Sequence, residues 1–521
     1  MIQNVEQRVI YTDNNLYLDY IAGREDALSF FAHRPRDFGL ALAARKEVNY
    51  PRAEVCSLLE TYNMRLQASD AALENLAALR ADSTFCVIAG QQAGFLGGPC
   101  FTTYKIITTI RLAKHLEREF GTRVVPLFWL AGDDHDFTEI NRVFFLKRDG
   151  EVSAVRFTWA EQGRPIHDLP LSKEVVDAYS EYFGAVIPGP NLRNAKELFA
   201  PEDGENYCTW HARIWSRLFS DYGLILVDPA LLRSPACPFF LDALKRHRDI
   251  QVALGNVAEK LRSVGYQLAL PGRAGGLYTL ADDGRRVRVD VPSKHLSSVV
   301  DHPERYSPDA ALRPLLADAL FPVLASVLGP GEIAYHAMLR PLYEIFELPQ
   351  PLLFPRKSYT VLSPEEHQLL LRWETSVQAI LDLTFDPDRT TRKLLSPRIR
   401  EPFSKARADL SEAMAPLSVL LKGIDPGLDR AWANTHVAAL RGIDRLEKKT
   451  ARAELAKRGL FPQQLRQLRN ILRPRERPQE RIFPLPHFIN QYGNDFLKRL
   501  FSMGKLDDFS HHIICMEEDH G

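Results

Sequence analysis

Two apolar runs joined by one amphipathic helix constrain the fold of this chain more than any other feature of its sequence. Residues 85–89 are strand formers that lead into the glycine-rich loop Gly90–Pro99. Residues 102–120 carry apolar side chains at helical spacing, and residues 124–130 form a second apolar run that ends in an acidic loop. This order of elements predicts a β-α-β unit.

The connection between the two predicted strands determines where their loops meet. Because such crossovers are right-handed, the strands are expected to be parallel, and ligands bind at the carboxyl edge of open α/β sheets. The pattern recurs later, with predicted strands at residues 224–227, 323–328 and 352–354 and a helix at residues 333–346. We therefore predict an α/β protein with a doubly wound parallel sheet and long insertions, and with both loops at one edge of that sheet.

Long polar helices follow the predicted sheet. From about residue 365 the sequence has helical spacing, most clearly at residues 409–421 and 430–457. The last helix carries a weak heptad of small and apolar residues at alternating steps of four and three: Ala439, Ile443, Leu446, Thr450 and Ala453. This pattern predicts an antiparallel α-helical coiled-coil arm that makes a homodimer contact.

These patterns divide the chain into three parts. Residues 1–361 are predicted to form the catalytic core with its connecting insertions, and residues 362–475 the helical arm. Residues 476–521 are predicted to return to the core. Several side chains within His511–His520 are of metal-ligand type, but a polar terminal tail is the simpler expectation.

Composition and charge indicate the class of ligand. The 521 residues exceed what one hydrophobic core usually supports, and 66 Lys and Arg balance 66 Asp and Glu. No overall charge therefore attracts nucleic acid or an anionic membrane. The six cysteines show no zinc-site spacing, which predicts free thiols in a reducing compartment. We expect a cytoplasmic protein that acts on small molecules, without nucleic-acid or membrane partners.

The glycine-rich loop is the first candidate binding element. Gly90 and Gly94 allow close backbone approach, and the amides of Gln91 and Gln92 can hold polar substrate groups. A helix N-terminus follows and favours an anion. The alternative is a tight connection that needs glycine only for its turn.

The acidic loop is the second candidate element. Asp133, Asp134, His135 and Asp136 follow a buried strand, where crowding is expected to perturb at least one pKa. They are the predicted catalytic residues, able to bind a substrate ammonium, hold Mg²⁺ or act as a general base. Because alternate residues of an extended loop point in opposite directions, about two of the four are expected to face the ligand.

Three more charged residues are predicted near the same edge. Lys105 lies in the first turn of the helix after the glycine-rich loop, and Glu332 and Arg356 lie in loops of the second half. The cations could neutralise a phosphate or carboxylate, although each side chain could equally be solvated.

Longer motifs carry a resemblance to a known family. The matching segments are Gly90–Gly94, Gly98–Pro99, Thr103–Lys105 and Val125–Asp136, with further matches at Leu16–Gly23, Leu218–Phe219, Asp221–Leu224, Gly329–Glu332, Tyr335 and Tyr492–Gly493. These segments resemble the BshC family, which is described as the cysteine ligases of bacillithiol biosynthesis. The resemblance spans most of the chain.

The resemblance implies a Rossmann-like core and a coiled-coil arm that dimerises. It implies a reaction that joins the carboxyl of cysteine to the amine of glucosaminyl-malate, the last step of bacillithiol synthesis. ATP or another adenine nucleotide with Mg²⁺ is associated with the family. Gln91 and Gln92 would help hold the substrate, with Lys105, Glu332 and Arg356 completing the pocket. Related adenylating enzymes place two histidines where this chain has Gln91 and Gln92.

Two other functions remain open from the residues alone. A metal-dependent phosphohydrolase would use Asp133–Asp136 as ligands, with Asp228, His295 and His336 as further candidates. A non-catalytic scaffold would dimerise through the arm and keep only a vestigial pocket.

Overall fold

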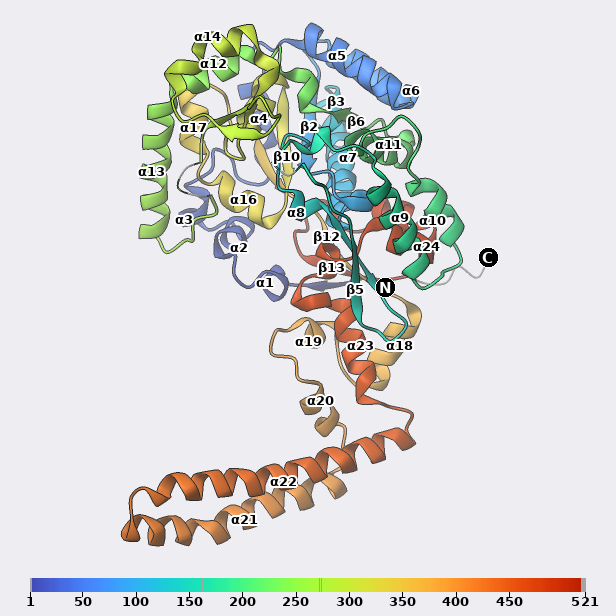
Figure 1. The fold of residues 1–521 in the computed structure, drawn as a ribbon, viewed down its shortest axis with the longest axis vertical. Helices are drawn as coiled ribbons and strands as arrows, with labels where there is room; N and C mark the ends of the chain where they lie inside the picture. The colour runs from blue at the N-terminus through green and yellow to red at the C-terminus, as the bar shows by residue number, and fades with distance from the viewer. Residues whose placement is uncertain (1, 162, 271, 273, 517–521) are drawn as a thin grey trace.

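A parallel sheet of five strands lies at the centre of the molecule (Figure 1). The computed structural model describes residues 2–161, 163–270, 272 and 274–516. The strands, in chain order, are β2 (Phe85–Gln91), β3 (Val124–Leu130), β6 (Ile225–Val227), β10 (Val323–Leu328) and β11 (Leu352–Pro355). Each lies parallel to its neighbours, so the predicted α/β fold with a doubly wound parallel sheet is confirmed.

The order of these strands places a switch point beside β2. Across the sheet the order is β11-β10-β2-β3-β6, so the chain winds outward from β2 in one direction and then returns to pair β10 on its other side. In open α/β sheets the crevice at such a reversal is where ligands bind, at the carboxyl ends of the strands. The glycine-rich loop leaves β2 at this point.

Both faces of the sheet are buried, each under its own hydrophobic core. Because successive side chains of a strand point to opposite faces, every strand contributes to both cores. In β2, Phe85, Val87 and Ala89 join one hydrophobic core, while Cys86 and Ile88 join the other. The first core is covered mainly by α7 (Phe101–Phe120), α9 (Lys173–Ala185), α11 (Tyr207–Leu218), α24 (Leu485–Tyr492) and α25 (Asp495–Ser502). The second is covered mainly by α2 (Asn15–Ile21), α5 (Arg52–Arg65), α6 (Asp70–Leu79), α12 (Cys237–Lys245), α13 (His247–Ser263) and α15 (Leu312–Leu320).

Two insertions connect the strands of the sheet. The first, between β3 and β6, contains the hairpin of β4 (Arg142–Leu146) and β5 (Val152–Arg156), with α8 (Phe137–Ile140) and α10 (Leu192–Phe199). The second, between β6 and β10, contains β7 (Leu277–Leu280), β8 (Arg286–Arg288), β9 (Tyr306–Pro308) and α14 (Leu296–Asp301). Trp210 and Trp215 of α11 are buried core residues, as expected of large aromatic side chains.

The helix predicted at residues 333–346 is in fact two helices. They are α16 (Pro330–His336) and α17 (Arg340–Ile345), with Pro341 in the first turn of α17. Inside one continuous helix, Pro341 would have no N–H to donate to the carbonyl of Ala337 and its ring would clash with that carbonyl, so the chain starts a new helix instead. The single long helix was therefore a wrong prediction.

A second sheet joins the two ends of the chain. In it β13 (His511–Cys515) lies between β1 (Ile2–Val5) and β12 (Ser358–Leu362), antiparallel to β1 and parallel to β12. His511 and His512 are buried in β13, so they are not part of a polar tail as predicted. The remainder of that run, Glu517–His520, lies outside the described residues. The return of the chain after the arm therefore places its end against its beginning.

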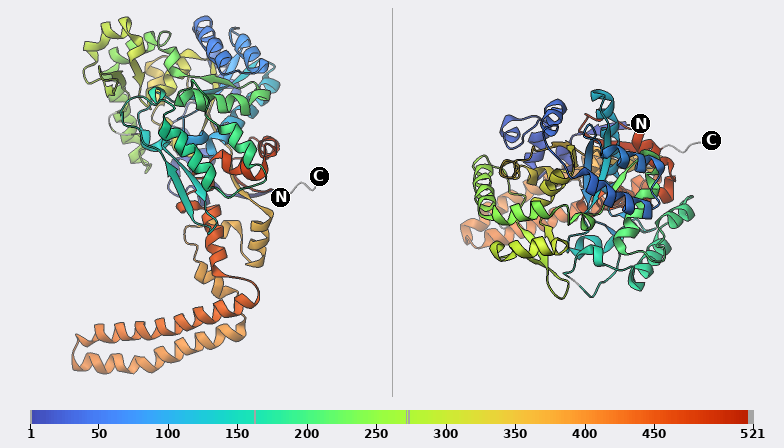
Figure 2. Two further views of the ribbon diagram at one scale, coloured as in Figure 1. Left: turned by 45° about the vertical axis from the view of Figure 1, so that its right-hand side comes forward. Right: turned by 90° about the horizontal axis from the view of Figure 1, so that it is seen from above.

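The arm is a hairpin of two long helices, α21 (Pro397–Ile424) and α22 (Leu428–Lys457). It lies apart from the body at the end remote from the sheet (Figures 1 and 2). Shorter elements carry it: α18 (Pro364–Arg372), α19 (Val377–Leu381), α20 (Pro387–Lys393) and α23 (Pro462–Leu472). No helix in the described part of the chain is long and apolar enough to cross a membrane.

The two arm helices contact each other through a seam that differs from the predicted heptad. Leu446 is 59% exposed, whereas the buried residues of α22 are Glu447, Ala451 and Leu455. Glu447 accepts a 2.8 Å hydrogen bond from Arg407 of α21. This ion pair between the two helices is not predicted by the apolar spacing of α22.

Candidate active site

A cavity of about 420 Å³ opens at the switch point between β2 and β10. Its floor is formed by β2 and β10 themselves, through Ile88, Ala89, Ser326 and Leu328. The polar side chains that line it are Gln91, Gln92, Glu139, Arg313, Asp318, Glu332, Tyr335 and His336. A concave site with a mostly apolar floor and a few convergent polar groups has the usual character of a small-molecule site.

Close backbone contacts require glycine at Gly94, in the loop after β2, and leave little room for a side chain at Gly90, near the end of β2. A Cβ atom on Gly94 would lie 2.6 Å from the Cα of Gly98, which no side chain tolerates. A Cβ atom on Gly90 would lie 3.3 Å from the backbone oxygen of Trp129 in β3. The loop therefore folds tightly on itself and holds Gln91 and Gln92 at the mouth of the cavity.

Lys105 does not line the cavity but holds the backbone and side chain at the end of β2 in place. Its amino group lies 2.6 Å from Glu332 and donates 2.9 Å hydrogen bonds to the backbone oxygen of Gly90 and to Oε1 of Gln91. Burial lowers the pKa of Lys105, and Glu332 opposes that shift. Glu332 also accepts a hydrogen bond from the backbone of Gly329 at the start of α16. One buried cation thus ties the loop after β2 to the loop after β10.

Asp134 holds two of the cavity's polar side chains. Its Oδ2 accepts a 2.9 Å hydrogen bond from Nε2 of Gln92 and lies 3.6 Å from Arg313, while its Oδ1 lies 4.0 Å from Arg286. Burial alone would raise the pKa of Asp134, but the two arginines and the Gln92 hydrogen bond lower it to about 2. Asp134 is therefore a permanent carboxylate near neutral pH that positions Gln92 and Arg313.

The other three residues of the acidic loop have separate surroundings. Asp133 is fully buried and forms an ion pair with Arg233. His135 lies 3.2 Å from Arg286 through its Nδ1 atom. Asp136 is exposed and caps α8 by accepting a 3.1 Å hydrogen bond from the backbone of Thr138. Of the four predicted catalytic residues, Asp134 has the most direct contact with groups that line the cavity.

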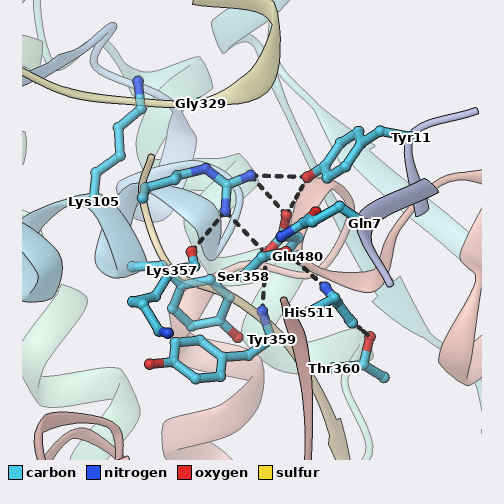
Figure 3. Close-up of polar contacts among 12 residues, drawn as sticks. Gln7, Tyr11, Lys105, Gly329, Lys357, Ser358, Tyr359, Thr360, Glu480 and His511 are labelled. Atoms are coloured by element: carbon cyan, nitrogen blue, oxygen red, sulfur yellow. Dashed lines mark hydrogen bonds and ion pairs between the residues drawn. The ribbon is translucent and has the colours of Figure 1, made fainter. Parts of the chain in front are cut away.

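Arg356 lies at the carboxyl end of β11, as predicted, but its side chain turns away from the cavity. Its guanidinium lies 2.6 Å from Glu480 and donates a 3.1 Å hydrogen bond to the hydroxyl of Tyr11. Figure 3 shows Tyr11, Ser358 and His511 gathered around Glu480, with Lys105 pointing away from this cluster. Arg356 thus joins the core to the returning C-terminal segment.

Several of the residues proposed as metal ligands already have polar or charged partners. Asp133 and Asp134 contact arginines, and Nδ1 of His295 lies 2.9 Å from the hydroxyl of Tyr306. Asp228 caps a short helix by accepting a hydrogen bond from Ala230. Within the described ranges, no group of three or more His, Cys, Asp or Glu is arranged to hold a metal ion. The cations around the acidic loop favour an anionic ligand over a metal ion.

Comparison with protein families matches both parts of the chain. Residues 3–357 match the family "Bacillithiol biosynthesis BshC, N-terminal Rossmann-like domain", and residues 360–516 match "Bacillithiol biosynthesis BshC, C-terminal coiled-coil domain". The chain belongs to the BshC family. The predicted resemblance, the Rossmann-like core and the coiled-coil arm are thereby confirmed.

Several BshC relatives are similar over almost their whole length. A protein of Geobacillus kaustophilus is 31% identical over 532 residues, covering 96% of this chain and 98% of the relative. One of Geobacillus thermodenitrificans is 30% identical, covering 96% and 97%, and one of Bacillus cytotoxicus is 29% identical, covering 89% and 90%. Their names include "cysteine ligase BshC", which confirms the prediction that this chain is an enzyme of the ligase class.

Several residues of the cavity were not among the site residues predicted from the sequence. Glu139 and Arg313 line it, Tyr335 was named only for its place in a matching motif, and His336 was considered only as a metal ligand. Glu139 lies three residues beyond the acidic loop, and burial together with Asp136 and Asp134 raises its pKa. Arg313 lies in the second insertion, where no local motif marks it. Glu139 had a usable signal, since it follows the acidic loop closely, and Tyr335 had one in the matching motif that begins at Gly329.

Proposed function

We propose that this enzyme forms an amide between the carboxyl of cysteine and the amine of glucosaminyl-malate. The observation that carries the proposal is the cavity at the switch point, where Gln91, Gln92 and Arg313 converge on one small volume. Two amides suit the hydroxyl groups of a sugar, and a guanidinium suits a carboxylate. Membership of the BshC family supports this choice of substrates.

Two residues that line the cavity would have different roles in such a reaction. Arg313 retains donors for a carboxylate, because its Nε has no hydrogen-bond partner and its ion pair with Asp134 spans 3.6 Å. Glu139 is the better candidate to accept the proton that the amine loses, because its pKa is raised whereas that of Asp134 is about 2. The amine nitrogen would then bond to the cysteine carbonyl carbon as the activated oxygen leaves with its electron pair.

An adenine nucleotide with Mg²⁺ is part of the proposal as the source of that activation. When bound it would turn the carboxylate oxygen into a leaving group. The loop from Gly94 to Gly98 would be the place for a phosphate group, because it leads to the N-terminus of α7, and Gly94, Gly98 and Thr102 line one cavity.

The arm is proposed to form a homodimer contact. Leu417, Leu420 and Ile424 of α21 are 46%, 59% and 68% exposed and are spaced to share one face of the helix. Such a stripe on a slender hairpin is suited to a second copy of the same hairpin. A cytoplasmic location remains a prediction.

The proposed reaction is tested by mass-spectrometric detection of bacillithiol. Purified protein is incubated with cysteine and glucosaminyl-malate, with and without ATP and Mg²⁺. Product that requires the protein supports the ligase, and its dependence on ATP tests the nucleotide. Absence of product under every condition, with correctly folded protein, contradicts the proposed reaction.

A further inference from the structure

A second cavity, of about 540 Å³, lies beside the first and is lined by four arginines. They are Arg142 from β4 and Arg475, Arg477 and Arg481 from the segment that returns from the arm. The two cavities share Gln91, Gln92 and Glu139 in their linings. A ligand in the arginine-lined cavity would therefore lie next to the proposed reaction site.

These arginines are not neutralised by the protein. Among the described residues, no carboxylate lies within the ion-pair distance of 4.0 Å of any of the four, although Glu139 also lines the cavity. Instead, the guanidinium carbons of Arg475 and Arg142 lie 5.1 and 5.8 Å from the ring centroid of Phe144. A guanidinium beside an aromatic ring can keep its N–H edge available, so these cations are ready to bind an anion.

Phe101 supports a third arginine of the cavity in a similar way. The guanidinium carbon of Arg481 lies 5.6 Å from its ring centroid. Phe101 begins α7, a helix of 20 residues whose N-terminus carries a partial positive charge. Thr102, the next residue, also lines the cavity, is fully buried, and its hydroxyl has no hydrogen-bond partner. A buried hydroxyl without a partner is costly unless a ligand supplies one.

Backbone contacts hold the arginine segment against α7. The backbone N–H of Cys100 donates a 2.9 Å hydrogen bond to the oxygen of Phe483, and Pro99 forms a β-bridge with Pro484. Arg475 and Glu476 both have positive φ angles, of 52° and 59°, which are uncommon for residues with side chains. The arginines are therefore presented by a fixed segment rather than by a loose terminus.

We propose that this cavity is an anion subsite that binds a doubly charged group, either paired carboxylates or a phosphate. The unpaired arginines, the N-terminus of α7 and the Thr102 hydroxyl converge on it. If the proposed function holds, the subsite would anchor an acidic part of a substrate while the reacting group occupies the neighbouring cavity. Anion binding itself does not depend on that function.

The test is isothermal titration calorimetry on the full-length chain, with malate and inorganic phosphate as separate probes. We expect saturable binding of at least one probe, weakened by added salt. The double variant Arg475→Gln, Arg477→Gln should bind at least about tenfold more weakly, because it loses charge-assisted hydrogen bonds. Arg65→Gln is the matched control, since Arg65 is exposed on α5 and lies outside both linings.

A second variant separates binding from folding. Thr102→Val removes a hydroxyl that makes no internal hydrogen bond, so the melting temperature should not fall while anion binding weakens. Binding of malate alone indicates a carboxylate subsite, and binding of phosphate alone a phosphate subsite. No saturable binding, or binding that both sets of changes leave intact, overturns the inference. Failure to form bacillithiol with anion binding intact would instead overturn only the proposed function.

Discussion

The side-chain amide of Gln92 donates a 2.9 Å hydrogen bond to Asp134, which joins the loop after β2 to the loop after β3. Both loops carry motifs that are recognisable in the sequence, but their contact exists only because the two strands are adjacent and parallel. The contact makes Asp134 a positioning residue. It orients one side chain that lines the cavity and partly balances a second, Arg313.

Asp134→Asn should reduce catalysis without unfolding the protein. The change removes the charge that faces Arg313 and Arg286, so we expect kcat/KM to fall about tenfold to a hundredfold, as a loss of about 1.4–2.7 kcal/mol of transition-state stabilisation. Asp203→Asn is the control, because Asp203 is exposed and lies outside the linings of both cavities. Equal loss of activity in both variants would contradict the assigned role, as would unchanged activity in Asp134→Asn.

Glu139→Gln should remove a titration from the pH profile of the reaction. Burial, with the charges of Asp136 and Asp134, raises the pKa of Glu139, and the ionised form is the one that accepts a proton. The wild-type rate should therefore fall as the pH drops through that raised pKa. The variant should be slower by about a hundredfold or more and should lack this acidic limb. An acidic limb that persists in Glu139→Gln would assign the proton transfer to another group.

Glu480→Gln should destabilise the fold strongly. It leaves Arg356 buried without its anion, which costs about 3–5 kcal/mol. Burial opposes ionisation of Glu480, but Arg356 prevails and lowers its pKa to about 2. The carboxylate's contribution is thus complete above the unfolded pKa of about 4.3 and is lost as the pH falls towards 2. Denaturant unfolding at pH 7 and at pH 3 measures both effects.

Tyr11→Phe provides the control for that experiment. It removes only a hydroxyl that donates a hydrogen bond to Glu480 and accepts one from Arg356, and it leaves the ion pair in place. We expect a loss of about 1–3 kcal/mol, smaller than for Glu480→Gln. A larger loss in Tyr11→Phe would show that the ion pair is not the main contribution.

The dimer proposal predicts a change of mass. Light scattering during size-exclusion chromatography should give twice the 59.2 kDa of one chain for the wild type. The double variant Leu420→Glu, Ile424→Glu should give a monomer, because it places charges on the exposed stripe of α21. Val252→Glu, which changes an apolar residue 56% exposed on the body, should remain dimeric. A dimer that survives the double substitution would exclude this stripe as the contact.

The sequence predicts the central sheet well because buried parallel strands are short apolar runs with clear ends. The bounds of β3 and β10 agree with the predicted residues 124–130 and 323–328. Prediction failed where a distant contact decides the outcome. Glu447 is buried in the arm because Arg407 of the facing helix pairs with it, and no periodicity in α22 contains that information.

The candidate site shows the same division. The sequence identified both loops, and the structure brings Gln91, Gln92 and Glu332 together around one cavity. Arg356 carries the same charge as a cavity arginine, but its partner Glu480 lies 124 residues away in the chain and turns it into the interior. Arg313 was missed by the sequence analysis although it lines the cavity. It lies on α15 in the second insertion, and no local motif marks it.

The most direct test of the account is a crystal structure of the protein with glucosaminyl-malate bound. We expect the sugar in the cavity between β2 and β10, with its amine within hydrogen-bond reach of Glu139 and its ring against Gln91 and Gln92. A sugar bound elsewhere, or an amine directed away from Glu139, would contradict it.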